Sequence, residues 1–73
     1  MPLNGSSYRE VARKLKKAGF REVSQKGSHV KFAKETIEGR RTATVPEHKE
    51  ITLGTLKSIL RQAGLSEEEF KAL

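Results

Sequence analysis

One histidine stands beside positive charge in a pattern suited to chemistry on a phosphate. The stretch from Lys26 to Phe32 has the sequence KGSHVKF, a glycine turn followed by alternating polar and apolar residues. Successive side chains of a β-strand point to opposite faces. If Val30 and Phe32 face a core, His29 and Lys31 share the other, open face. Imidazole changes its charge near neutral pH, so we expect an acid–base group beside a fixed cation.

RNA can be cut without a metal when its 2′-hydroxyl attacks the adjacent phosphorus. This reaction needs a base for the hydroxyl proton, an acid for the leaving 5′-oxygen and positive charge near the phosphate. We predict His29 as the general base or acid, with Lys26 and Lys31 neutralising the phosphate. One histidine cannot carry both proton transfers at once. Either it acts in turn, or a water, a lysine or His48 supplies the second.

Two further residues have both a chemical and a structural interpretation. Ser28 can position a phosphate through its hydroxyl or its amide, and is equally explained as a turn residue. His48 can serve as an auxiliary catalytic group, but capping or orienting its loop is the simpler role. Two histidines without cysteine or aspartate make a poor metal site, so we predict neither a metal nor a cofactor.

The charge of the chain favours a polyanionic partner. Its net charge is +6, and residues 1–65 hold fourteen Lys or Arg against six Glu, whereas the last eight residues hold three Glu and one Lys. Nucleic acid is the usual partner of so basic a body. The other interpretation is that the basic residues keep a small protein soluble.

The chain carries no sign of export or membrane insertion. It has no cysteine for a disulfide, and Met1–Gly5 lacks the layout of a signal peptide. No apolar run approaches the ~20 residues that span a bilayer. We therefore predict a cytoplasmic protein without membrane contact.

The first helix is predicted from Tyr8 to Ala18, with Ser6-Ser7 as its cap and Gly19 at its end. Helical spacing gives it an apolar stripe of Tyr8, Val11, Ala12, Leu15 and Ala18. Its other face is basic, and is either a solvated surface or a phosphate-binding ridge. The predicted RNA contacts on it are Arg13, Lys14 and Lys17.

Three strands are predicted next, over residues 21–26, 29–34 and 40–45. Gly27-Ser28 forms the first turn, and Glu35–Gly39 is expected to be a longer, exposed turn. Pro46 stops the third strand, because proline cannot donate to the ladder. Arg40 and Arg41 are further predicted RNA contacts.

A second helix is predicted from Thr52 to Gly64, followed by a short helical turn that starts at a Ser66–Glu69 capping box. The order α-β-β-β-α predicts a single α+β domain over residues 1–73. Its two layers are a three-stranded antiparallel sheet and two helices on one sheet face. The apolar face under the helices is predicted to carry Val23, Val30, Phe32 and Val45.

Four segments, in order and across nearly the whole chain, match one protein family. They are Val11–Phe20, which ends in Gly-Phe, Gly27-Ser28-His29 followed by Phe32, Val45-Pro46-Glu47-His48, and Gly54–Leu65. With these motifs the chain resembles the HicA (YcfA-like) toxins. The resemblance implies the toxin of a type II toxin–antitoxin system, an mRNA interferase on a fold like that of double-stranded-RNA-binding domains. It also implies inhibition by a HicB-type antitoxin and a catalytic role for His29.

Other classes of function remain open at the level of sequence. A non-catalytic RNA-binding module of the same fold would use the basic first helix for shape-based recognition of duplex RNA. A DNA-binding or ribosome-associated protein would show the same charge. With one Tyr and three Phe, an aromatic platform for stacking single-stranded bases is not expected. An antitoxin that inhibits cleavage would have to cover His29 with a complementary acidic surface.

Overall fold

The computed structural model describes residues 6–73, and its elements follow the predicted order. The expectation made for Met1–Gly5 lies outside the described residues. The elements are α1 (Tyr8–Lys17), β1 (Arg21–Lys26), β2 (His29–Thr36), β3 (Gly39–Pro46), α2 (Leu53–Ala63) and α3 (Glu67–Lys71). No helix in the described part of the chain is long and apolar enough to cross a bilayer.

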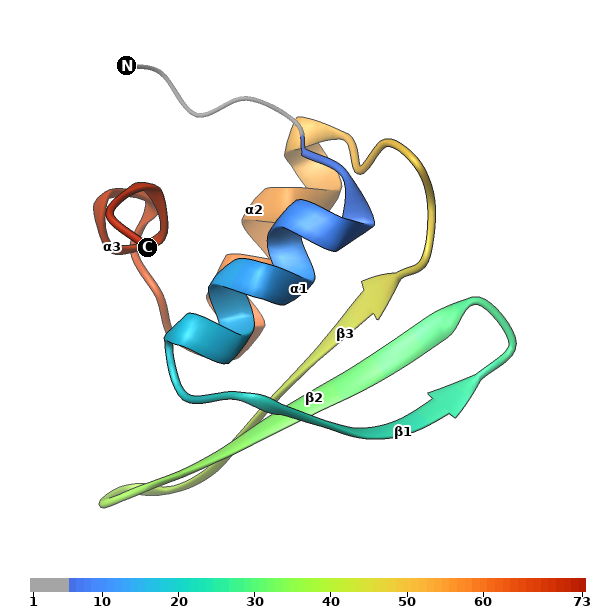
Figure 1. Ribbon diagram of the computed structural model, residues 1–73. Helices are drawn as coiled ribbons and strands as arrows, with labels where there is room; N and C mark the ends of the chain where they lie inside the picture. The colour runs from blue at the N-terminus through green and yellow to red at the C-terminus, as the bar shows by residue number, and fades with distance from the viewer. Residues whose placement is uncertain (1–5) are drawn as a thin grey trace.

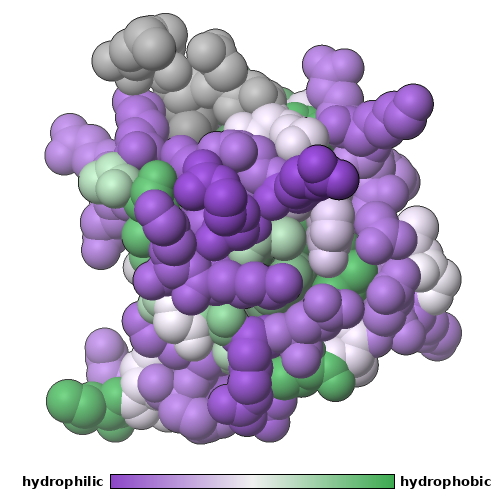
Figure 2. All heavy atoms as spheres, in the orientation of Figure 1, coloured by the Kyte–Doolittle hydropathy of each residue, from purple (hydrophilic) through white to green (hydrophobic). Residues whose placement is uncertain are grey.

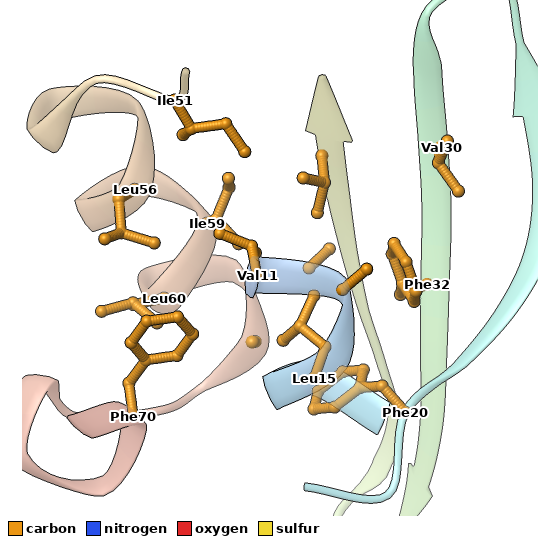
Figure 3. Close-up of a cluster of buried hydrophobic side chains, with 14 residues drawn as sticks. Val11, Leu15, Phe20, Val30, Phe32, Ile51, Leu56, Ile59, Leu60 and Phe70 are labelled. Carbon is orange, nitrogen blue, oxygen red and sulfur yellow. The ribbon is translucent and has the colours of Figure 1, made fainter. Parts of the chain in front are cut away.

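The strands form one antiparallel sheet in the order β1-β2-β3, and α1 and α2 lie over one of its faces (Figure 1). Side chains from both layers meet in a single apolar cluster between them (Figure 3). Its fully buried members include Val30 and Phe32 from β2, Leu15 from α1 and Leu56 from α2. The predicted α+β class, with both helices on one sheet face, is confirmed.

Both long helices begin at a hydroxyl cap and end at a glycine, which confirms the prediction for the Ser7 cap and for the two glycines. Ser7 accepts a hydrogen bond from the Glu10 amide at the start of α1, and Thr52 accepts one from the Thr55 amide at the start of α2. Gly19 follows α1 with a φ of 101°, and Gly64 follows α2 with a φ of 73°. Side chains with a Cβ rarely adopt such angles, so these glycines let the chain turn back over its own helix.

The capping box predicted at the third helix is present. The Ser66 side chain accepts from the Glu69 amide, and the Glu69 carboxylate accepts from the Ser66 amide. These two hydrogen bonds hold the pKa of Glu69 below its ordinary value, the bond from the Ser66 backbone being the larger cause. The short helix places Phe70 in the core, where it is 1% exposed. The chain therefore gains a core residue from its last few positions.

Two local expectations were wrong. The turn between β2 and β3 is not long, because β2 continues to Thr36 and β3 starts at Gly39, which leaves only Ile37 and Glu38 between them. The Thr36 hydroxyl donates to the Gly39 carbonyl at 2.6 Å and closes this tight turn. Val23 is only partly buried, because the strand pairing shifts there by one residue. An extra residue of this kind is a β-bulge, and it takes its side chain out of the regular alternation.

Candidate active site on the open face of the sheet

The start of β2 places His29 on the sheet face that the helices leave free. Val30 and Phe32 are fully buried in the core, whereas His29 and Lys31 are exposed. Figure 3 shows Val30 and Phe32 pointing from β2 toward the helices. Because side chains alternate along a strand, His29 and Lys31 point the other way. The alternation predicted for this stretch is confirmed.

Strand pairing brings a second lysine to the same histidine. His29 is the direct partner of Lys26 in β1 and of Pro46 in β3. Facing residues of antiparallel strands point to the same side, with Cα atoms about 5 Å apart. Lys31 lies two residues along β2, about 7 Å away along the strand. His29 therefore has a cation on each of two sides.

The same register defines the rest of this surface. We call it the open face, and its residues are Arg21, Ser24, Lys26, His29, Lys31, Ala33, Glu35, Arg40, Thr42, Thr44 and Pro46. Sequence reasoning missed Arg21. Arg21 and Lys26 are five residues apart, a spacing that puts residues of a regular strand on opposite faces. The bulge at Val23 adds one residue and so returns Arg21 to the face of Lys26.

The turn before His29 is fastened to the loop that follows β3. Gln25 Nε2 donates to the Gly27 carbonyl at 3.1 Å and to Glu47 Oε1 at 3.3 Å. The Glu47 amide donates to the Ser28 carbonyl at 2.5 Å. These bonds join Gln25, Gly27, Ser28 and Glu47 into one unit that fixes where β2 begins. Gln25 and Glu47 lie 22 residues apart in sequence, and no local pattern could have paired them.

His48 is used mainly through its backbone. Its carbonyl accepts from the Tyr8 amide at 3.2 Å, and its amide donates to the Pro46 carbonyl at 2.9 Å. It lines a shallow pocket at the start of α1 with Ser7, Arg9 and other neighbours. The structure does not place His48 on the open face, and its contacts fit the structural role more closely than the auxiliary catalytic one.

The predicted contacts on α1 lie in the helical layer, on the far side of the sheet from His29 (Figure 1). Arg13 donates to the Glu10 carboxylate at 2.5 Å, and this hydrogen bond holds the pKa of Glu10 below its ordinary value. Lys14 Nζ donates to the Phe70 carbonyl at 3.2 Å and lies 4.7 Å from the centre of the Phe70 ring. Lys17 is exposed near the end of the helix. The structure does not bring these three cations together with His29.

Arg40 and Arg41, the two predicted RNA contacts on β3, point to opposite faces of the sheet. Arg40 is on the open face, with its Nε 3.9 Å from the Glu35 carboxylate. Arg41 points to the helix side of the sheet. Its guanidinium lies close to Gly64, because a Cβ added to Gly64 would be 3.0 Å from Arg41 Cζ. Arg41 thus lies at the negative end of α2, which suits a cation.

The described residues offer no cluster of acidic and imidazole side chains for a metal site. Within residues 6–73 no group of three or more His, Cys, Asp or Glu side chains is placed to hold one metal ion. Figure 2 shows one face of the molecule, in the orientation of Figure 1, and most of that face is hydrophilic. On the open face the exposed His29 lies with Lys26 and Lys31, whereas the other imidazole, His48, lines a separate pocket with Arg9, Lys49 and Glu47.

The family of the chain follows from a comparison of its sequence. A family model described as "HicA toxin of bacterial toxin-antitoxin" matches residues 8–65, which span α1, all three strands and α2. A search of curated proteins returned no match. The match covers most of the chain and confirms the resemblance in the four motifs. The chain belongs to the HicA family of toxins from bacterial toxin–antitoxin systems.

Proposed function

We propose that this toxin is an endoribonuclease, an mRNA interferase that needs no metal and uses His29 as its general acid or base. The observation that carries the proposal is the placement of His29 on the open face, exposed and flanked by Lys26 and Lys31. Membership of a toxin family supports a toxic activity, and this arrangement supports chemistry on a phosphate.

In the proposed reaction the 2′-oxygen of a ribose attacks the adjacent phosphorus. The bond from phosphorus to the 2′-oxygen forms while the bond to the 5′-oxygen of the next nucleotide breaks. His29 takes the 2′-hydroxyl proton or donates a proton to the leaving 5′-oxygen, and a water molecule or a lysine carries the other of these two transfers. Lys26 and Lys31 offset the charge that grows on the phosphate. The products are a 2′,3′-cyclic phosphate and a free 5′-hydroxyl, with no net change in protons.

We further propose that a HicB-type antitoxin inhibits the enzyme by covering the open face in the cytoplasm. An inhibitor of this chemistry has to exclude RNA from His29. The open face carries four Lys or Arg residues against Glu35 alone. An acidic antitoxin surface would complement that charge and speed association.

Cleavage assays on matched substrates test the ribonuclease. We expect purified protein to cut RNA in EDTA and to leave DNA of the same sequence intact, because DNA lacks the attacking 2′-hydroxyl. Products should carry cyclic phosphate ends. Binding of RNA without any cleavage would contradict the enzyme and favour the non-catalytic RNA-binding module.

A further inference from the structure

We infer that the substrate lies as a single RNA strand along the open face, from His29 over Lys31 toward Arg21 and Arg40, and that the basic side of α1 is not its binding site. The inference rests on the proposed function and adds to it the form of the substrate and its path. It also assigns Arg21, which the sequence pattern did not indicate, as a binding residue.

Two further cations of the open face lie in the same direction from His29 along the sheet, Arg21 on β1 and Arg40 on β3. Arg21 pairs with Ala33, four residues beyond His29, which is about 13 Å along β2. Arg40 pairs with Glu35, two residues farther. Within residues 6–73, Arg21, Lys26 and Lys31 form no ion pair or side-chain hydrogen bond. A strand bound at His29 therefore meets further positive charge in one direction along the sheet.

The surface between these cations consists of small side chains and has no aromatic one. It is made of Ser24, Ala33, Thr42 and Thr44. Ala33 is only 1% exposed although it points to the open face, so its neighbours enclose it. The four aromatic residues of the chain lie elsewhere, three in the core and Tyr8 on α1. Without an aromatic platform for stacked bases, we expect the affinity to come mainly from contacts to phosphates and riboses.

The basic side of α1 offers a weaker site for the strand that is cut. Arg9, Arg13 and Lys16 line a groove that also contains the carboxylates of Glu22 and Glu47. Burial, and then these two carboxylates, raise the pKa of Tyr8 in the same groove. The negative charge lowers the attraction for a polyanion. The groove is also on the helical side of the sheet, whereas the scissile phosphate has to lie at His29.

The chemistry favours a single strand over a duplex. The attacking 2′-oxygen, the phosphorus and the leaving 5′-oxygen have to come into line, which requires a backbone that is free to turn. A strand held through its phosphates on a shallow face keeps that freedom. Duplex RNA is recognised as a rigid shape across its grooves. The open face therefore fits a short unpaired segment of RNA.

Binding of an RNA that cannot be cut tests the path separately from catalysis. The probe is a short 2′-O-methyl RNA, single-stranded or annealed to its complement, titrated against wild-type protein at several salt concentrations. We expect Arg21→Gln and Lys31→Gln each to lower the salt slope by about 0.7 and the affinity about fourfold near 0.15 M salt, as the loss of one phosphate contact predicts. The single strand should bind more tightly than the duplex.

Three further variants complete the design. Arg9→Gln and Lys17→Gln report on the basic side of α1, and Lys57→Gln makes the same charge change on an exposed position of α2. We expect these three to bind like the wild type. Loss of affinity in the α1 variants with none in the open-face variants would overturn the path, as would tighter binding of the duplex. If His29-dependent cleavage persists in that case, only the path fails. A wild type that neither binds nor cuts RNA would remove the proposed function as well.

Discussion

Two groups of basic residues are distinct in this protein, those that contact helix ends and those exposed on the open face. Lys34 donates to the Ala18 carbonyl at the end of α1, Arg41 lies against Gly64 at the end of α2, and Lys14 donates to the Phe70 carbonyl in α3. Each helix C-terminus carries partial negative charge, so a cation from another element stabilises it. These three side chains stabilise helix ends, whereas Arg21, Lys26 and Lys31 on the open face form no ion pair or side-chain hydrogen bond within residues 6–73.

The role of Lys34 can be measured directly. Its Nζ lies 2.6 Å from the Ala18 carbonyl oxygen and 5.9 Å from the centre of the Phe20 ring. Lys34→Met keeps the apolar stem but removes the charge, and we expect a loss of about 1 kcal/mol of folding free energy. For a domain of this size that lowers the melting temperature by about 4–8 °C. Lys57→Met, on an exposed site, is the control, and equal melting temperatures for the two variants would contradict this role.

At the scale of elements, the glycines at helix ends set how the layers are joined. Gly64 has a φ of 73° and is covered by the Arg41 guanidinium, whereas a Cβ added to Gly54, inside α2, would meet no atom within 4 Å. The first glycine is required by its backbone angle and its neighbour. The second is an ordinary helical position that happens to lack a side chain.

These two glycines form a matched pair for mutation. Gly64→Ala forces alanine into a left-handed conformation and should destabilise the fold by at least about 1 kcal/mol. Gly54→Ala should stabilise it by up to about 0.5 kcal/mol, because glycine loses more freedom on entering a helix and Gly54 is in the first turn of α2. Urea unfolding followed by circular dichroism measures both. A Gly64→Ala variant as stable as the wild type would show that the left-handed turn is not required.

Local sequence patterns predicted the helices and strands well. Features that depend on how the strands pair could not be predicted from them. The caps, the terminal glycines and the alternation from His29 to Phe32 depend on near neighbours, so sequence was sufficient to predict them. The bulge at Val23 depends on how β1 lies against β2, and it alone decides that Arg21 joins the open face. The tight turn after Thr36 likewise depends on β2 and β3 pairing to their ends. Sequence therefore grouped His29 with Lys26 and Lys31, but it missed Arg21 on the open face and did not indicate that Arg41 points to the other face.

At the scale of the whole molecule, one face of the sheet packs against the helices and the other face is open. Helices α1 and α2 cover one sheet face (Figure 1), and α3 adds Phe70 to the buried cluster (Figure 3). The net charge of +6 leaves the body attractive to any polyanion. Under the proposed function, the open face is where an antitoxin would restrain the toxin, because His29 and its neighbouring lysines lie there.

The proposed inhibition makes a prediction about the complex with a HicB-type antitoxin. We expect binding to suppress RNA cleavage, to protect His29 from an imidazole-modifying reagent and to slow as salt is raised, since opposite charges steer association. Peptide mapping of the modified complex measures the protection. A complex in which His29 is still modified and RNA is still cut would show that the antitoxin acts elsewhere.

The most direct test of the catalytic claim is the rate of RNA cleavage by His29→Ala beside the wild type, in EDTA, with both folds checked by circular dichroism. Loss of a general acid–base group should reduce the rate at least ~100-fold while the fold and RNA binding persist. His48→Ala, which removes the other imidazole, shows which histidine is responsible. Equal cleavage by the wild type and His29→Ala, or a loss confined to His48→Ala, would contradict the assignment of His29 as the catalyst.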